Sequence, residues 1–302
     1  MKQSWQQRIM RWVGMAGAVG ILIAGFAAPA EDVVVTQNRT FRGKVKSADA
    51  NGIAIEISVQ GVPSTITVPR DRIVQVTVEP PPSVIRGIEA YEKGNIKEAQ
   101  LNLGKVMMQY QGLDVAWAAK GMIYFARASL AAGDYEKAEK SFSLFVTGYP
   151  DHPRLQDARI GLVEIDLVKK NYETALAKFR ELAEPYNKQL KPPEGELPYA
   201  AEIYMGIGKC QEGQSNPTEA LQAYLRVVAL YPAEAYYPEA LYRSAMLYAG
   251  LNHPEKAEIL LTELIGDYAA SPFAPMAIKE KKALGARRGA ESGSTGSKPA
   301  TP

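Results

Sequence analysis

The sequence predicts a mainly α protein: an α-α superhelix of about five helix pairs with a capping helix, preceded by a small all-β module. Three observations lead to this prediction. An alanine recurs in five similar helical segments within residues 94–264. Residues 31–79 instead alternate apolar and polar side chains, as half-buried strands do. Prolines 80–82 separate the two patterns, because consecutive prolines neither continue a strand ladder nor stand inside a helix.

Residues 1–30 have the pattern of an export signal. A basic start is followed by the uncharged apolar run WVGMAGAVGILIAGF and then by small residues. This layout predicts a signal peptide cleaved after Ala30, and an uncleaved membrane anchor over residues 12–30 is the alternative. In either case we expect the rest of the chain outside the cytoplasm, in a bacterial periplasm.

Composition sets limits on the partner and on the chemistry. The chain has 302 residues, of which 46% are hydrophobic and 23% charged, as in ordinary globular proteins. Its one cysteine, Cys210, excludes an intramolecular disulfide and a cysteine-based metal site. The formal net charge is +2, and the basic leader accounts for it, so the remainder is close to neutral. We therefore expect no nucleic-acid partner, since a near-neutral body has no strong field to attract one.

The module at residues 31–79 reads as β structure. Four segments are short and rich in Val, Ile and Thr, and turn signals such as Asn51-Gly52 separate them. So many short strands in so few residues predict a strongly bent sheet or a small barrel. The expected strands are residues 40–48, 52–60, 64–70 and 72–79.

The segments GNIKEAQLNLGKV, GDYEKAEKSFSLF, KNYETALAKFREL, SNPTEALQAYLRV and LNHPEKAEILLTEL align with one another. They share an alanine, a large apolar residue four positions later and an apolar residue three positions after that, and the alanines are 37 to 45 residues apart. This self-similarity predicts a stack of repeated units. The alanines are Ala99, Ala138, Ala175, Ala220 and Ala257; the residues four later are Leu103, Phe142, Phe179, Tyr224 and Leu261.

Each unit also begins with an earlier helix, whose apolar residues recur at intervals of three and four. A small residue stands where this first helix should approach its partner, and we expect it to face the alanine of the second helix. The large residue that follows the alanine would then fill the gap to the next unit. The small residues are Gly87, Ala126, Gly208 and Ala245, with Val163 as the exception.

The ends of the helical region, residues 83–284, are also recognisable. The piece SPFAPMAIKEKKALGA is expected to form a terminal helix that covers the apolar face of the last unit. Residues 285–302 are of low complexity and are expected to be disordered. Between the third and fourth units, PYNKQLKPPEGELP either lengthens a helix or bends the solenoid.

Together these columns resemble tetratricopeptide repeats, over about 200 residues in five units with a period somewhat longer than the family's 34 residues. The pieces between units, such as YPDHPRLQDA, resemble the longer repeats of bacterial envelope proteins, namely outer-membrane assembly and Tol–Pal coordination factors. The β module resembles small Sm-like barrels through its FRGKV strand and VPRDRI turn. The resemblance implies a tetratricopeptide solenoid that follows a small barrel.

No catalytic constellation stands out in the sequence. His152 and His253 lie beside prolines in expected exposed turns, without a cluster of metal-ligating residues around them. The segment GIGKC lacks the first glycine and the Ser/Thr of a phosphate-binding loop. Glu164 and Asp166 are two residues apart and would point to different sides of a helix. We therefore expect no enzymatic activity, no cofactor and no metal.

A stack of helix pairs would present a concave groove built from its first helices. Apolar and aromatic side chains with charges of both signs suit an extended peptide or a partner helix there, although ordinary helix packing explains some of these positions equally well. The corresponding places for a carboxylate clamp hold Lys120, Asp157, Glu202 and Glu239, which does not support such a clamp. The predicted groove residues are Ile88, Tyr91, Ile123, Arg127, Ile160, Glu164, Met205, Lys209, Tyr242 and Met246.

The sequence thus predicts a non-enzymatic scaffold of the cell envelope that binds protein partners. The alternative is a protein that binds the cell wall or a membrane surface through its β module. The basic residues of RTFRGKVK favour this alternative, unless they merely guard a solvated strand edge. They are Arg39, Arg42, Lys44 and Lys46. The identity of the partner and the oligomeric state stay open.

Overall fold

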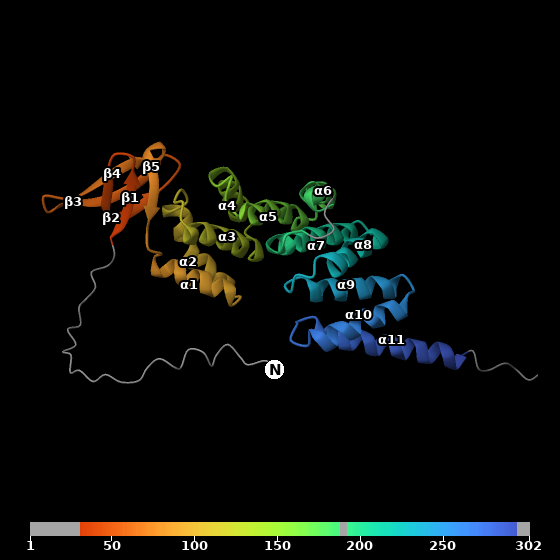
Figure 1. Ribbon diagram of the computed structural model, residues 1–302. Coiled ribbons are helices and arrows are strands. Elements are labelled where there is room, and N and C mark those ends of the chain that lie inside the picture. Colours follow the sequence, from red (N-terminus) through yellow and green to blue (C-terminus); the bar gives the residue numbers. More distant parts are fainter. Residues whose placement is uncertain (1–30, 188–191, 295–302) are drawn as a thin grey trace, which may run out of the picture. The chain divides into compact units, whose positions relative to one another are not determined.

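A computed structural model describes residues 31–187 and 192–294 of the chain (Figure 1). In these residues a five-stranded antiparallel sheet precedes eleven α-helices, which confirms the predicted fold class. The predicted signal peptide or anchor, residues 1–30, lies outside the described residues. None of the helices in the described part is long and apolar enough to cross a membrane.

The sheet has the strand order β4-β3-β2-β1-β5. Its register shifts within β1, after Val35, and within β2, between Val45 and Ser47, as at β-bulges, which bend a sheet. Val34, Val45 and Ile55 are buried in its core. The VPRDRI turn forms a 3-10 helix, Arg70–Arg72, before the last strand. The strands are β1 (Asp32–Thr36), β2 (Thr40–Ala48), β3 (Gly52–Val59), β4 (Val62–Pro69) and β5 (Ile73–Thr77).

Strand β1 is absent from the sequence-based prediction of four strands. Its sequence, DVVVT, is a short run of valines without polar alternation, and it adjoins the expected cleavage site. The strand nevertheless pairs with β2 on one side and β5 on the other, so it lies inside the sheet. Burial of Val34 between its neighbours explains why valine suits this strand.

The sheet joins the helical region through hydrogen bonds. The guanidinium of Arg70 donates to the carbonyl of Gly112, and the indole of Trp117 donates to the carbonyl of Val78 at 2.7 Å. Gly112 is required here because a Cβ atom at this position would lie 2.3 Å from the carbonyl oxygen of Asp49. The apolar cores of the sheet and of the first two helix pairs belong to one cluster of buried side chains.

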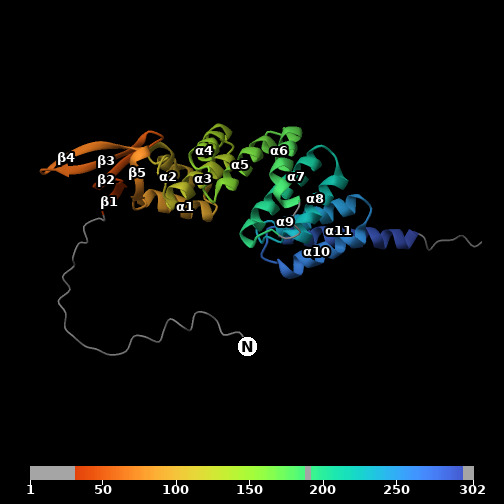
Figure 2. The ribbon, with the colours of Figure 1, turned by 45° about the horizontal axis from the view of Figure 1, so that its top comes forward.

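The helices form consecutive pairs that contact the pairs before and after them, as both views of the ribbon show (Figures 1 and 2). The pairs are α1 (Pro82–Glu92) with α2 (Ile96–Gln109), α3 (Ala116–Ala131) with α4 (Tyr135–Gly148), α5 (Leu155–Val168) with α6 (Tyr172–Asn187), α7 (Leu197–Gly213) with α8 (Pro217–Leu230), and α9 (Tyr237–Gly250) with α10 (Pro254–Asp267).

The repeated columns are the core of this stack. All five alanines and all five large residues four positions later are fully buried. Two of the small residues of the first helices, Gly87 and Gly208, lie against these large side chains. A Cβ atom added at Gly208 would lie 2.3 Å from the ring of Tyr224, and one at Gly87 would lie 2.6 Å from Leu103. At these two positions the large side chain occupies the space that the glycine leaves, and the expected contact of the small residues with the alanines stays a prediction.

The last helix, α11 (Ala274–Ser294), covers the fifth pair. Its Ala277 and Leu284 are buried with Leu261 and Leu264 of α10, as expected of a capping helix. The helix continues to Ser294, so the predicted start of a disordered tail at residue 285 is too early, and residues 295–302 lie outside the described part. Earlier in the chain, α6 includes Pro185 and extends to Asn187, so the proline-rich piece does lengthen a helix. A short 3-10 helix, η3 (Glu194–Glu196), then precedes α7.

Candidate functional site

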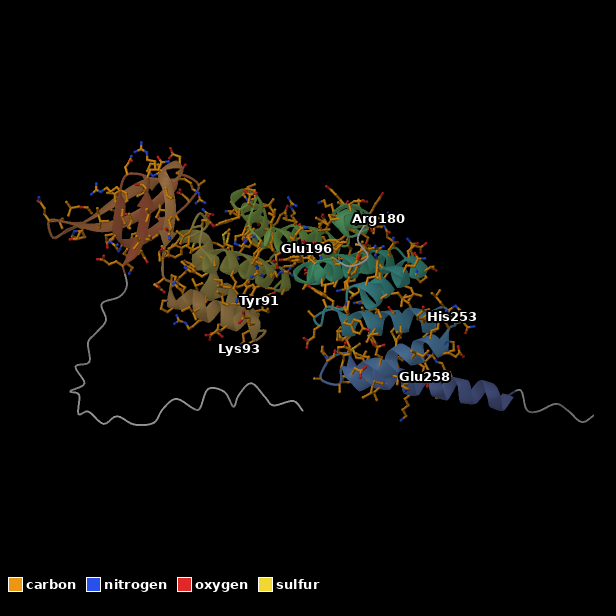
Figure 3. The ribbon with its side chains drawn as sticks, in the orientation of Figure 1. Tyr91, Lys93, Arg180, Glu196, His253 and Glu258 are labelled. Atoms are coloured by element: carbon orange, nitrogen blue, oxygen red, sulfur yellow. The ribbon has the colours of Figure 1, made fainter. Side chains whose placement is uncertain are left out.

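The ten predicted groove residues all lie on the first helices of the pairs, two on each. Three of them, Ile123, Ile160 and Met205, are 0 to 2% exposed and pack in the core. They belong to the clusters of buried apolar side chains between neighbouring helices, so a partner cannot reach them. These three are corrected to packing residues. The other seven are partly exposed, among them Tyr91 on α1 (Figure 3).

A buried ionic cluster lies on this face in the middle of the stack. Arg127 of α3 donates to Glu202 of α7, with 2.9 Å between Nη1 and Oε1. The same guanidinium lies 3.5 Å from Asp157 and 3.7 Å from Glu164, both on α5. The hydroxyl of Tyr199 donates to Asp157 at 2.9 Å. One cation thus holds three carboxylates from two other helices, and this cluster ties three successive units together.

The pKa values of Arg127 and Glu164 in this cluster are both raised, but for different reasons. Burial works against the charge of Arg127, but the carboxylates of Glu202 and Glu164 outweigh it and raise the pKa of the guanidinium. Burial, with the charge of Glu202 second, raises the pKa of Glu164 to about 7, while Arg127 opposes the shift. Arg127 therefore stays charged, and the cluster takes up a proton near neutral pH.

Ion pairs continue along the same face toward the last pair. Lys209 of α7 lies 3.1 Å from Glu239 of α9, and Arg243 of α9 lies 2.7 Å from both Glu239 and Glu212. The hydroxyl of Tyr224 donates to Glu212 at 2.6 Å. We call the cluster around Arg127 and these pairs the ionic ladder. It fixes the first helices of neighbouring units against one another.

Apolar and aromatic side chains flank the ionic ladder at both ends. On α1, the ring of Tyr91 packs against Tyr124 with 4.5 Å between ring centroids. On α9, the ring of Tyr242 lies 5.8 Å from that of Phe273. Ile88 and Met246 are partly exposed beside them. The face therefore has a charged middle and two apolar ends.

Sequence reasoning places three of the eight charged residues of the ladder in the groove. Arg127, Glu164 and Lys209 are among the predicted groove residues, whereas Asp157 and Glu202 enter the sequence analysis only as positions that do not fit a clamp. The missed signal is the spacing: Asp157 and Glu202 stand seven residues before Glu164 and Lys209, which is two helical turns on one side. The charges at these two repeat positions differ in sign from one unit to another, and this difference would have predicted ion pairs between units.

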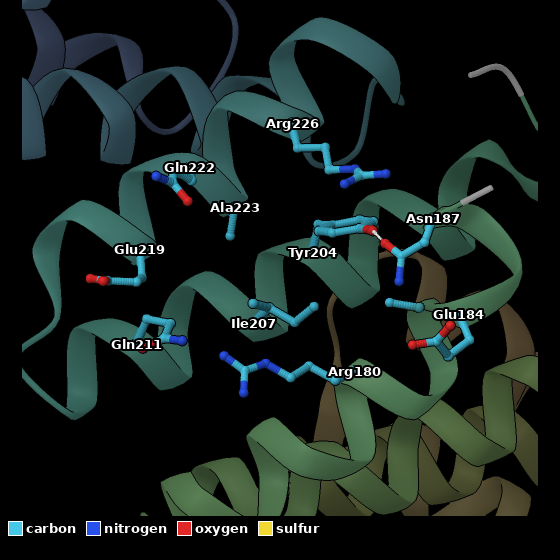
Figure 4. A pocket seen from close by; sticks show the side chains of 11 residues that line it. Arg180, Glu184, Asn187, Tyr204, Ile207, Gln211, Glu219, Gln222, Ala223 and Arg226 are labelled. Carbon is cyan, nitrogen blue, oxygen red and sulfur yellow. Dashed lines mark hydrogen bonds between the residues drawn. The ribbon is translucent and has the colours of Figure 1, made fainter. Parts of the chain in front are cut away.

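A separate pocket of about 380 Å³ lies among α6, α7 and α8 (Figure 4). Arg226 stacks 4.6 Å above the ring of Tyr204, whose hydroxyl donates to Asn187 at 2.6 Å. Among the described residues, the Nε atom of Arg226 has no hydrogen-bond partner. Arg180 and Glu184 add charges of both signs to the wall. None of the predicted groove residues lines this pocket.

The histidines and the cysteine differ in exposure. His253 is exposed, as predicted for a turn (Figure 3). His152 is half-buried against Phe145 and Tyr149, and burial lowers its pKa, which corrects the expected exposed turn. Cys210 is buried, and burial raises the pKa of its thiol to about 12. No group of His, Cys, Asp and Glu side chains in the described part of the chain could hold a metal ion.

Comparison with known proteins supports the repeat assignment. Residues 202–233 and 239–271, which include most of α7 and α9 and all of α8 and α10, match the family model of the tetratricopeptide repeat. No curated protein matches the chain. The fourth and fifth helix pairs therefore carry the tetratricopeptide sequence pattern.

The fold of the helical region is supported by a solved structure. The chain is similar to a thermophilic TPR protein of Thermus thermophilus, with 14% identity over 67% of this chain and 96% of that chain, at a TM-score of 0.50. It is also similar to MamA 41-end from Desulfovibrio magneticus RS-1, with 15% identity over 63% of this chain and 95% of that chain, at a TM-score of 0.43. The helical region has the fold of a tetratricopeptide solenoid.

Proposed function

We propose that this chain is a non-enzymatic scaffold of the bacterial cell envelope, which binds a segment of a partner protein along the face of its first helices. Export of the chain is inferred from residues 1–30 alone, whose basic start and apolar run are typical of a signal peptide or anchor. Proteins with tetratricopeptide repeats generally mediate protein–protein interactions, which supports the class of function.

The observation that carries this proposal is the ionic ladder. Arg127 reaches across α5 to Glu202, and Lys209 and Arg243 continue the contacts to Glu239. Side chains held in this way lose little conformational freedom when a partner binds, so more of the contact energy is retained as affinity. A surface fixed in advance suits recognition.

The chemistry of the face indicates the kind of segment. Tyr242 and Met246 offer an apolar contact on α9, and Ile88 and Tyr91 offer another on α1. Aromatic and methionine side chains are enriched at the centres of protein interfaces. We therefore propose a partner segment with apolar anchors at separated positions and polar groups between them.

Paired alanine variants test this proposal. Tyr242→Ala with Met246→Ala should remove a partner that copurifies with the full chain from envelope extract. Met276→Ala with Ile278→Ala is the matched control, because both are exposed apolar residues on α11. Both variants should keep the helical circular dichroism of the parent, and the Tyr242 variant should melt at a lower temperature because Tyr242 packs on Phe273. Retention of the partner by the Tyr242 and Met246 variant would overturn the proposal for this face.

A second candidate function is binding of the cell wall or a membrane surface through the β module. One observation favours it: Arg42 and Lys44 of β2 are exposed and have no ion pair within the described residues. Five short strands with bulges and a 3-10 turn also support the proposed Sm-like barrel.

The second candidate has its own test. Lys46 lies 3.0 Å from Glu56, whereas Arg42 and Lys44 have no ion pair among the described residues. Arg42→Glu with Lys44→Glu should abolish cosedimentation of the full chain with isolated cell-wall material or with anionic vesicles. Unchanged cosedimentation would exclude this role for the strand.

A further inference from the structure

A second surface lies on the second helices of the first two units and is separate from the first-helix face. It is a groove of about 870 Å³ between α2 and α4, with Phe125 of α3 among its lining residues. Leu101 and Met108 of α2 line it and are 78% and 76% exposed. They are seven residues apart, which places them on one side of the helix.

The pair of exposed apolar side chains, rather than either one alone, is particular to this unit. Leu101 stands two residues after the repeat alanine, where α4 and α8 have Lys140 and Gln222. In α10 this position is the exposed Ile259, but Gly266 follows seven residues later, so that helix lacks the second apolar side chain. Met108 stands nine residues after it, where α4 has Thr147. Large apolar side chains that the stack does not bury are unfavourable in water and indicate a surface for binding.

Gly104 keeps this groove open. It lies in the middle of α2, where glycine is less favourable than alanine. A Cβ atom at this position would meet only the ring of Phe125, at 3.5 Å, which is an ordinary contact. Packing within the chain therefore does not require glycine here, unlike at Gly208. Its effect is to leave space in the groove.

The rim of the groove is basic. Lys97, Lys105 and Lys140 line it, and none of the three has an ion pair within the described residues. Lys137 is paired with Asp134, the one acidic residue among those lining the groove. An apolar groove between unpaired lysines is complementary to an apolar stripe with carboxylates beside it.

The charge of a segment also indicates whether it could occupy the groove between α2 and α4. The segments outside the described part, residues 1–30, 188–191 and 295–302, contain no Asp or Glu. None of them carries an acidic side chain that could pair with the lysines. An apolar groove between two helices is the kind of site in which an amphipathic helix of a partner binds.

We propose that the groove between α2 and α4 binds an amphipathic helix of a partner protein, with aliphatic residues on one stripe and acidic residues on its flanks. The aliphatic stripe would contact Leu101, Met108 and Phe125. The carboxylates would pair with Lys97, Lys105 and Lys140. This interaction is independent of the first-helix face.

The test uses the full chain and two labelled model helices of the same length as α2, measured by fluorescence anisotropy. Both helices carry leucines on one stripe, and the flanks are glutamate in one and lysine in the other. The acidic helix should bind, and its affinity should fall as salt is added. Equal binding of the basic helix, or no binding of the acidic helix, would overturn the proposal.

Two variants separate binding from folding. Gly104→Leu fills the groove and should weaken binding at least about tenfold, while the melting temperature stays the same or rises because leucine favours helix. Gly266→Leu is the matched control, since a Cβ atom there has nothing within 4 Å. Lys105→Glu with Lys140→Glu should abolish binding, and Lys279→Glu on α11 should not.

The remaining occupants are distinguished with the same variants. Binding to vesicles of phosphatidylglycerol that Gly104→Leu abolishes, without binding of the acidic helix, would overturn the proposal in favour of a membrane surface. Self-association in sedimentation that Gly104→Leu abolishes would overturn it in favour of a second copy of this chain.

Discussion

The guanidinium of Arg127 on α3 donates to the carboxylate of Glu202 on α7 at 2.9 Å, although α5 intervenes in the order of the helices. The two residues are 75 positions apart in the sequence. The contact joins the second unit to the fourth and places Asp157 and Glu164 around the same cation. Both the stability of the stack and its response to pH should therefore depend on this cation.

Removal of the cation should destabilise the protein strongly. Arg127→Met leaves three carboxylates close together without their counter-charge, which we expect to cost about 3–5 kcal/mol in the free energy of unfolding. Chemical denaturation at neutral pH measures this change. Arg127→Lys should recover only part of it, because lysine lacks the planar fork of the guanidinium. A loss below about 0.5 kcal/mol would contradict the buried cluster.

The cluster should also give stability a pH dependence. Glu164 has a pKa of about 7 in the folded chain and an ordinary value of 4.5. Between these values the folded state binds more protons than the unfolded state, so the contribution of Glu164 to stability is present below pH 4.5 and is lost as the pH rises to about 7.

The variant Glu164→Gln separates the pH dependence of stability that is due to Glu164 from that of the other titrating groups. Its melting temperature relative to the parent should rise steadily from about pH 4.5 to about pH 7.5. A difference that stays constant over that range would show that Glu164 titrates normally.

Close packing of small residues against large ones gives a third prediction. Gly208→Ala places a Cβ atom 2.3 Å from the ring of Tyr224, and we expect a loss of about 1–3 kcal/mol. Gly250→Ala on α9 is the control, because nothing lies within 4 Å of its Cβ position. That control should be neutral or slightly stabilising in thermal unfolding. Equal effects of the two substitutions would mean that α7 and α8 are further apart than described.

The joint between sheet and helices can be tested through Trp117. Its indole donates to the carbonyl of Val78 at 2.7 Å. Trp117→Phe keeps most of the ring packing but removes this donor, so we expect a loss of about 1 kcal/mol. Denaturant titration followed by circular dichroism measures it. An unchanged midpoint would indicate that water replaces the hydrogen bond without cost.

The helical units could be predicted because their signal is local. Ala99 and Leu103 are four residues apart on one helix, and that interval recurs in every unit. The module at 31–79 was recognisable for the same reason, since Ile53, Ile55 and Ile57 alternate with polar residues. Strand β1 lacked that alternation, and only its pairing with two neighbours defines it.

The site was harder to predict because it depends on distances between units. The periodicity of α3 places Arg127 on the first-helix face but does not foresee its contact with Glu202, which requires the positions of three helices at once. Burial of Ile123 likewise depends on how closely neighbouring helices approach. Periodicity gives the side of a helix and does not give that distance.

The most direct test of the proposed scaffold is site-specific photocrosslinking in the producing cells. A photoreactive residue at Tyr242 should crosslink the full chain to a partner protein, and one at the exposed Met276 should not. A third position, Arg42 on β2, reports on the β module. Crosslinks at Tyr242 that disappear with Met246→Ala would support recognition by the first helices. Crosslinks at Arg42 alone would contradict it and assign recognition to the β module.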